Sequence, residues 1–275
     1  TVDGALQKGV RAKDLVLYVI SKISAGGARP KILISEHKET GVIIAGDREV
    51  SEAYKHYLVK LHIDDGDGYN KQKVEYAYYL LAREAGIDMM PSKLIEDTHF
   101  ATLRYDRQHG EKQHVLTVTG VTGWDFKSQP ENSTYENVFK VALSLGVPHK
   151  DLQQLFKRMV FNLVFRNVDD HLKNHSFMYH KEGNSWNLGP AYDVTFALNP
   201  LLTFKTTSRA LSMNGKRTDI TLKDVLVIAD TFSIKNPKGI IGEVQACIPR
   251  WVAVAKELKM PAHVITSIQK EFKRL

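Results

Sequence analysis

The stretch Asn167-Val-Asp-Asp-His-Leu-Lys-Asn-His-Ser176 packs two carboxylates, two imidazoles, one lysine and two amides into ten positions. Apolar residues at helical spacing from about residue 150 to 165 come directly before it and predict a buried helix. Two strand candidates, residues 176–179 and 186–188, follow it and predict a hairpin, because Gly183-Asn184 separates them. Beyond the hairpin lies a lone acid, Asp193. Since both flanks of the polar stretch are apolar, solvation explains its composition poorly, and a functional cluster explains it better.

Phosphoryl transfer requires side chains in this order. One carboxylate must orient the attacking hydroxyl and accept its proton, while an asparagine and a second carboxylate hold Mg²⁺ against a triphosphate. Oxygen ligands suit a hard ion such as Mg²⁺. The spacing therefore predicts Asp169 as the catalytic base and Asn174 and Asp193 as the metal ligands.

Other interpretations of the same stretch remain open from the sequence. Asp170 could cap a helix or a turn. His171 and His175 stand four positions apart, as zinc ligands on a helix do, although no glutamate lies between them. His171 could instead line a nucleotide pocket, and Lys173 could either neutralise phosphate charge or brace Asp169.

The first third of the chain has the pattern of a small β-rich part. A helix is expected after its third strand and should end at Gly86. Beyond Asp106 the pattern becomes mostly helical, with helices expected near residues 222–231, 240–257 and 262–272. The strand candidates of the first part are residues 31–34, 42–45, 57–61, 93–96 and 100–105.

A glycine-rich turn lies just before the first of these strands. Consecutive glycines let backbone N–H groups approach phosphate oxygens closely, and neighbouring cations add attraction. An ordinary tight turn is the alternative interpretation. The candidate phosphate-binding residues are Gly26, Gly27, Ala28, Arg29 and Lys31.

Lys60 lies in an apolar strand candidate, residues 56–61. A lysine on a buried strand is costly unless it is paired, and Glu75 on the following helix is the expected partner. Kinases use such a pair to contact the α- and β-phosphates of ATP. An edge-strand lysine that points into water is the alternative. After residues 100–105, a hinge could offer backbone groups to adenine, and Asp106 could bind a ribose hydroxyl.

The composition sets broad limits. Of 275 residues, 43% are hydrophobic and 25% charged, which excludes a disordered or fibrous protein. No apolar run is long enough to cross a bilayer and no signal peptide is recognisable, so we expect no membrane association and a cytoplasmic location. Cys247 is the one cysteine and is expected to be buried. The net charge of +7 fits either nucleic-acid binding or ATP binding. Four cations fall close together and form either a docking surface or a solvated face: Lys205, Arg209, Lys216 and Arg217.

Taken in order, these motifs resemble the HipA family, whose members are kinase toxins of bacterial toxin–antitoxin systems. The resemblance covers nearly the whole chain. It rests on residues 26–31 (GGARPK), 59–60 (VK), 75–78 (EYAY), 104–107 (RYDR), 167–176 (NVDDHLKNHS), 190–193 (PAYD) and 212–217 (SMNGKR).

The resemblance implies an α+β, two-lobed protein-kinase-like fold, with a small β-rich N-lobe over residues 1–106 and a larger, mostly helical C-lobe over residues 107–275. It implies that Asp169 is the catalytic base, although Asp170 stands where some relatives have glycine. It implies autophosphorylation on Ser24 or on Ser21. The alternative for Ser24 is an ordinary turn serine. The remaining implied roles are Asn174 and Asp193 for Mg²⁺, Lys60 and His171 for the ATP phosphates, Leu103 and Tyr105 for hinge backbone, and Asp106 for the ribose. Lys173 stays a further candidate for ATP binding.

By the same resemblance, the cofactors are ATP and Mg²⁺ and the substrate is a protein, of the aminoacyl-tRNA synthetase class. The implied partners are a HipB-like DNA-binding antitoxin and, because this chain is similar to short HipT-like forms, a separate small protein that replaces the N-terminal subdomain. DNA would be contacted only through the antitoxin. The rival hypothesis is a catalytically silent basic component of an antitoxin–operator complex, and a small-molecule kinase is a third.

Overall fold

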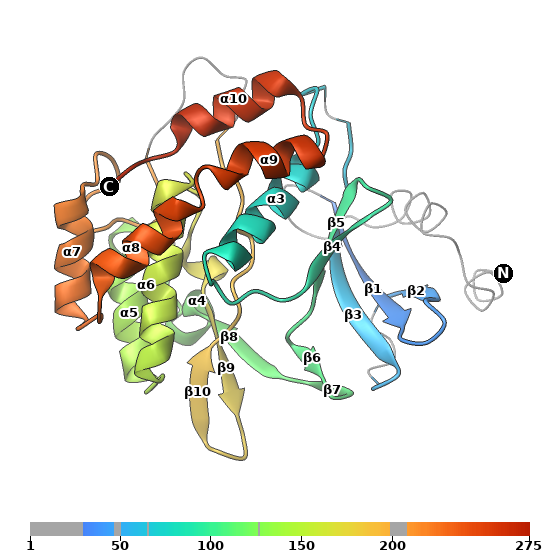
Figure 1. Ribbon diagram of the computed structural model, residues 1–275. Helices are drawn as coiled ribbons and strands as arrows, with labels where there is room; N and C mark the ends of the chain where they lie inside the picture. The colour runs from blue at the N-terminus through green and yellow to red at the C-terminus, as the bar shows by residue number, and fades with distance from the viewer. Residues whose placement is uncertain (1–29, 47–50, 65, 126, 199–207) are drawn as a thin grey trace. The chain divides into compact units, whose positions relative to one another are not determined.

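The computed structural model describes residues 30–46, 51–64, 66–125, 127–198 and 208–275 (Figure 1). These residues group into two compact units. The first comprises the described residues of 1–76 and 90–113, and the second comprises 77–89 and 114–275. The predicted division into lobes after Asp106 stays a prediction. Within the described ranges, no helix combines the length and hydrophobicity that crossing a membrane requires.

The first unit is built on a five-stranded antiparallel sheet with the order β2-β1-β3-β5-β4. Alternating side chains of β1 and β3 point into one small core, as the period of two along a strand requires. A short ribbon of β6 (Arg107–Gln108) and β7 (Glu111–Lys112) follows the sheet. The strands of the sheet are β1 (Lys31–His37), β2 (Ile43–Ala45), β3 (Tyr54–Lys60), β4 (Ser92–Ile95) and β5 (His99–Leu103).

Helix α3 (Lys71–Glu84) contains the point at which the two units divide. Asn70 caps its start, because its side-chain oxygen accepts the N–H groups of Gln72 at 2.8 Å and Lys73 at 3.0 Å. Gly86 has a φ of +76° and ends the helical segment as predicted.

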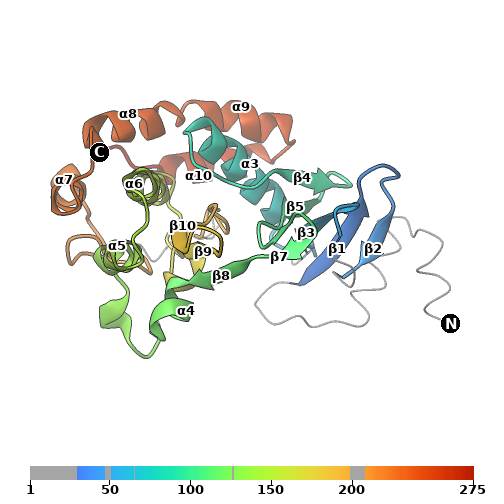
Figure 2. The same ribbon diagram turned by 90° about the horizontal axis from the view of Figure 1, so that it is seen from below.

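The second unit is a group of helices with a three-stranded antiparallel sheet of order β10-β9-β8. Figures 1 and 2 both show α5 beside α6, and α6 also contacts α8. The strands are β8 (His114–Thr117), β9 (Ser176–His180) and β10 (Ser185–Leu188), and 3-10 turns cover Pro130–Asn132 and Leu172–Asn174. The helices are α4 (Val118–Thr122), α5 (Tyr135–Ser144), α6 (His149–Val164), α7 (Leu222–Thr231), α8 (Pro237–Ala246), α9 (Arg250–Glu257) and α10 (Ala262–Glu271).

An aromatic core surrounds the end of α6. Tyr78 is fully buried, and its ring meets Phe161, Phe165 and Trp251 edge-on at centroid distances of 6.2, 6.0 and 5.9 Å. Its hydroxyl donates to the backbone oxygen of Phe165 at 2.6 Å, so the buried O–H has a partner. Burial raises the pKa of Tyr78 well above its usual value. This core fixes the point at which the chain leaves α6 and enters the polar stretch.

The helix predicted over residues 240–257 is wrong as a single element. The structure has two helices there, α8 and α9, separated by Cys247, Ile248 and Pro249. A proline inside a helix lacks the N–H that the helical hydrogen bond needs, so the second helix begins only after Pro249. Cys247 is buried as expected, and burial raises the pKa of its thiol.

Candidate active site

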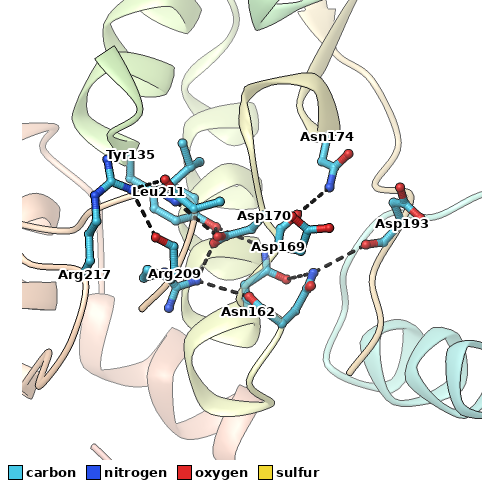
Figure 3. A network of polar contacts seen from close by, with 11 residues as sticks. Tyr135, Asn162, Asp169, Asp170, Asn174, Asp193, Arg209, Leu211 and Arg217 are labelled. Carbon is cyan, nitrogen blue, oxygen red and sulfur yellow. Dashed lines mark hydrogen bonds and ion pairs between the residues drawn. The ribbon is translucent and has the colours of Figure 1, made fainter. Parts of the chain in front are cut away.

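The two consecutive carboxylates of the polar stretch, Asp169 and Asp170, lie in different environments. Helix α6 ends at Val164, and Arg166 beyond it adopts a left-handed φ of +58°. Asp169 is exposed, whereas Asp170 is only 1% exposed. One acid therefore faces solvent while its neighbour is held in the interior of the second unit (Figure 3).

Asp170 is bound by groups that lie far away in the sequence. Its Oδ2 accepts the hydroxyl of Tyr135 at 2.5 Å and a guanidinium N–H of Arg209, and its Oδ1 accepts the backbone N–H of Leu211 at 3.4 Å. The interpretation of Asp170 as a local helix or turn cap is therefore wrong. A buried and fully engaged carboxylate is also poorly suited to accept a proton from a substrate, which leaves Asp169 as the candidate base.

Burial of Arg209 would lower its pKa, but the Asp170 carboxylate outweighs burial and holds that pKa above its usual value. The two groups thus form a buried, charged pair. Breaking such a pair on one side leaves an uncompensated charge in the interior.

A chain of amides continues from Tyr135 to the second acid of the motif. The hydroxyl of Tyr135 accepts from Asn162 at 3.0 Å, and Asn162 in turn accepts from Asn167 at 3.1 Å. Asn167 also approaches the backbone oxygen of Asp193 at 3.5 Å. Figure 3 shows this network running from Arg209 to Asp193.

Sequence reasoning missed Tyr135 and Asn162 altogether. The detectable signal was an asparagine among the apolar residues of α6, because buried polar groups are almost always hydrogen-bonded.

Asn174 fixes the backbone next to the candidate base. Its Nδ2 donates to the carbonyl oxygen of Asp169 at 2.9 Å, and its own N–H donates to the carbonyl of His171 at 2.8 Å. The amide oxygen of Asn174 therefore points away from Asp169 (Figure 3). Asp193 adopts a left-handed φ of +58° on a different segment of the same unit.

The pKa of Asp169 is raised. Partial desolvation is the largest cause, the neighbouring His171 opposes it, and the carboxylates of Asp193 and Asp170 add to it. Asp169 and Asp193 are thus close enough for their charges to repel.

The donor set suits Mg²⁺. Asn174 offers an amide oxygen and Asp193 a carboxylate, and Mg²⁺ takes one or two such ligands while water and phosphate oxygens complete its octahedron. The zinc interpretation fares worse, because no group of three His, Cys, Asp or Glu in the described part of the chain could hold a metal. His175 is a buried core imidazole that packs against Tyr135 at 5.6 Å. Burial and the cation of Arg158 lower its pKa to about 3.

In the first unit, the structure brings together Lys60 and Glu75. The Nζ of Lys60 lies 2.6 Å from Oε1 of Glu75, and the two side chains are 10% and 5% exposed. Strand β3 lies between β1 and β5, so the interpretation of Lys60 as an edge-strand lysine is wrong. Lys31 stands opposite Lys60 in the register of β1 and β3.

The predicted hinge residues follow β5. The N–H of Leu103 donates to the backbone oxygen of Pro91 at 3.0 Å, so this N–H is already engaged. The carboxylate of Asp106 is bound by Arg104 at 2.7 Å and by Arg107 at 2.9 Å. Burial would raise the pKa of Asp106, but these two cations outweigh burial and lower it.

The structure says less about the roles of the remaining predicted site residues. His171 precedes the 3-10 turn of Leu172–Asn174, and Lys173 is exposed, with its carbonyl bound by the hydroxyl of Tyr192 at 2.6 Å. Several predicted residues lie outside the described residues: Ser21, Ser24, Gly26, Gly27, Ala28, Arg29 and Lys205.

The basic cluster predicted around residue 210 serves internal contacts. Arg209 is 3% exposed and binds Asp170, while Lys216 pairs with Asp224 at 2.9 Å. Arg217 donates to the carbonyls of Pro130 at 2.8 Å and Ser133 at 3.1 Å, among others. For Arg209, the interpretation as part of a solvated face or a docking surface is wrong, because its charge is buried.

Residues 23–255 match the model of the HipA-like C-terminal domain family. The chain is 24% identical over 231 residues to the putative kinase Y4dM of Sinorhizobium fredii, an alignment that covers 77% of this chain and 55% of that protein. The chain thus spans about half the length of this curated relative.

Two solved structures have similar folds. A chain of the Shewanella oneidensis MR-1 complex of HipA, HipB and operator DNA superposes with a TM-score of 0.68 at 14% identity, over 95% of this chain and 70% of that one. The Helicobacter pylori proinflammatory kinase CtkA superposes with a TM-score of 0.50 at 12% identity, over 79% of this chain and 88% of that one. The predicted α+β kinase-like fold is confirmed, and the chain belongs to the HipA-like C-terminal domain family.

Proposed function

We propose that this chain is an ATP- and Mg²⁺-dependent serine/threonine protein kinase, the toxin of a bacterial type II toxin–antitoxin system. The observation that carries the proposal is the pair Asp169 and Asp170. One carboxylate is exposed, while its immediate neighbour is bound in the interior by Tyr135 and Arg209. A carboxylate whose backbone is held in this way can orient a hydroxyl without first having to be ordered.

In the proposed reaction, Asp169 accepts a hydrogen bond from a serine or threonine hydroxyl and takes its proton as the oxygen attacks the γ-phosphorus. The bond from that phosphorus to the β–γ bridging oxygen breaks, and ADP leaves with the electron pair. Asn174 and Asp193 would hold Mg²⁺, which supplies neutralisation of the triphosphate charge when bound. Lys60, held by Glu75, contacts the α- and β-phosphates.

The family and the names of the relatives support the finer parts of the proposal. One relative is named a putative kinase, one similar structure is a kinase, and another belongs to a toxin–antitoxin complex with operator DNA. We infer a HipB-like antitoxin as partner, with DNA contacted through it, and a protein substrate of the aminoacyl-tRNA synthetase class. Ser24 and Ser21 are the proposed autophosphorylation sites. His171, Lys173 and the segment of residues 26–31 complete the proposed nucleotide contacts.

Radiolabelled ATP tests this proposal directly. The chain, first treated with phosphatase, is incubated with Mg²⁺ and γ-labelled ATP, alone and with cell lysate, and phosphosites are mapped by mass spectrometry. We expect label on Ser24 or Ser21 and on one lysate protein. Asp169→Asn should reduce both by about 10²–10⁴-fold, the usual contribution of a general base. Asp230→Asn removes an exposed carboxylate of α7 and should change neither.

Absence of label from wild-type chain that binds ATP would contradict the proposal and favour a silent component of an antitoxin–operator complex. Equal labelling by Asp169→Asn would contradict the role of Asp169. Label that enters metabolites and no protein would instead identify a small-molecule kinase.

A further inference from the structure

A cavity of about 120 Å³ lies in the second unit, behind the candidate catalytic loop. This volume is several times the roughly 10–15 Å³ that one water molecule needs. In Figure 3, Arg209 and Arg217 lie on the opposite side of Asp170 from Asn174 and Asp193. The polar wall of the cavity consists of Arg166, Arg209, Arg217, Lys273, Thr218 and Asp219.

The charges around this cavity do not balance. Four cations and one carboxylate, Asp219, line it. Two more carboxylates stand behind the wall, because Asp170 binds Arg209 and Glu271 lies 4.0 Å from Arg166. Asp224 also acts on Lys273, but it is paired with a further cation, Lys216. Five cations and four carboxylates are then counted, and one positive charge remains in excess. Cations held close together in a partly enclosed cavity repel one another, and a bound anion offsets that repulsion.

The pKa values of individual cations reflect the same crowding of positive charge. Burial lowers the pKa of Arg166, and the nearby charge of Arg209 lowers it further, against the opposing effect of Glu271. Burial likewise lowers the pKa of Lys273, and Arg166 and Arg209 add to this effect. One negatively charged ligand would offset the repulsion among these cations.

A donor in the wall has no partner in the described part of the chain. The Nε–H of Arg209 is buried and makes no hydrogen bond there, although the adjacent Nη2 on the same edge of the guanidinium binds Asp170. Arg209 as a residue is only 3% exposed. A buried N–H without an acceptor costs about 1–3 kcal/mol, so a ligand oxygen that reached it would recover that penalty.

The rest of the wall is arranged for a small anion. Arg217 contributes charge, because its N–H groups are already given to backbone carbonyls such as Pro130 and Ser133. Arg166 and Lys273 are partly exposed, and Thr218 and Asp219 are exposed, so the cavity opens to solvent. Guanidinium groups bind phosphate oxygens through charge-assisted hydrogen bonds better than they bind most other acceptors.

We propose that this cavity is a binding site for a phosphate group, held by Arg166, Arg209 and Lys273 with the charge of Arg217 behind them. The site lies apart from the nucleotide contacts proposed above and shares none of their residues. Arg209 belongs both to this site and to the network that holds Asp170. A bound phosphate group is thus contacted by the same guanidinium that fixes the catalytic loop.

Calorimetric titration with inorganic phosphate at constant ionic strength tests the site, with a saturating non-hydrolysable ATP analogue present so that the nucleotide site is occupied. The wild type should bind phosphate, whereas Arg166→Gln and Lys273→Gln should each bind at least tenfold more weakly. Arg274→Gln is the matched control, because it removes the same charge from an exposed neighbour of Lys273, and it should bind as the wild type does. No binding by the wild type, or equal affinity in all variants, would overturn the proposal.

A second measurement does not depend on the folding of any variant. In wild-type chain labelled at arginine Nε, phosphate should shift the Nε–H resonance of Arg209 downfield, and an unchanged resonance would contradict the proposal. Repeating the titration with O-phosphoserine distinguishes the source of the group. Binding of both ligands indicates a site open to phosphorylated side chains, and binding of inorganic phosphate alone indicates a site for the free anion.

Discussion

The carboxylate of Asp170 is bound by the guanidinium of Arg209, which lies 39 residues further along the chain. Both residues are buried, at 1% and 3% exposure. This pair ties the candidate catalytic loop to the segment that precedes α7, and it does so immediately beside the exposed Asp169. The position of the candidate base thus depends on a contact that no local pattern encodes.

Removal of Asp170 should strongly destabilise the protein. In Asp170→Ala the charge of Arg209 is left buried without its partner, and we expect a loss of about 3–5 kcal/mol in the free energy of unfolding. Urea denaturation followed by circular dichroism measures this loss. Asp230→Ala, at an exposed position of α7, should stay within about 0.5 kcal/mol of the wild type. A wild-type denaturation curve for Asp170→Ala would show that the pair contributes nothing.

The hydroxyl of Tyr135 should matter independently of its ring. Tyr135→Phe keeps the buried ring but removes the donor to Asp170 and the acceptor for Asn162. We expect a loss of about 1–3 kcal/mol in unfolding free energy, because two buried polar groups lose a partner. Tyr179→Phe is the control, since its hydroxyl donates to the side chain of the exposed Asn184. Its expected loss is at most about 1 kcal/mol, and an equal loss in the two variants would contradict the prediction.

Variants of Lys60 and Lys73 should show whether the Lys60–Glu75 pair contributes to the use of ATP. Lys60→Met should lower kcat/KM for ATP by the equivalent of about 2–5 kcal/mol, the usual effect of removing one partner of a buried charge pair. Lys73→Met is the control change, on the helix that carries Glu75, because Lys73 pairs with the largely exposed Asp97. It should alter kcat/KM little, since such pairs contribute about 0–1 kcal/mol. Similar losses in both variants would argue that Lys60 has no special role.

Metal dependence should involve Asp193 and Asn174. We expect chelation of divalent cations to abolish labelling by the wild type. Asp193→Asn and Asn174→Ala should raise the Mg²⁺ concentration for half-maximal labelling at least tenfold, because each removes an oxygen ligand. The readout is initial rate against Mg²⁺ concentration. A variant whose rate falls while its Mg²⁺ requirement stays constant would assign that residue a role other than metal binding.

Asp224 should contribute a pH-dependent part of the stability. Burial would raise its pKa, but hydrogen bonds from the N–H and O–H of Thr221 and from Asn214 and Lys216 outweigh burial and lower it. A lowered folded-state pKa stabilises the fold above the unfolded value, which is about 3.9, and the effect is lost as the pH falls below it.

The stability difference between wild type and Asp224→Asn should therefore be constant near neutral pH and shrink below about pH 4. Urea denaturation at a series of pH values measures it. The exposed Asp230→Asn should show no such convergence, and a difference for Asp224→Asn that does not change with pH would contradict the assignment.

Local patterns predicted much of the fold because they depend on neighbours in the chain. The helix before the polar stretch and the hairpin after it were predicted from periodicity and from Gly183-Asn184, and the structure has α6, β9 and β10 there. The error at residues 240–257 had a local signal as well, since Pro249 lies inside the predicted helix. Apolar periodicity continues across Pro249 and by itself favours one helix, whereas the missing N–H of the proline favours two.

The residues of the candidate site also fall into those that local sequence predicts and those that only the folded chain identifies. The sequence by itself determined the family, the order of Asp169, Asn174 and Asp193, and the expectation that Lys60 needs Glu75, because these depend on residue types and short spacings. The tertiary structure alone decided that Asp170 is buried, that Arg209 is its partner and not a surface cation, and that Tyr135 and Asn162 complete the network. A buried charge selects its partner from whatever the folded chain brings within hydrogen-bond reach, and that choice depends on the packing of helices far apart in the sequence.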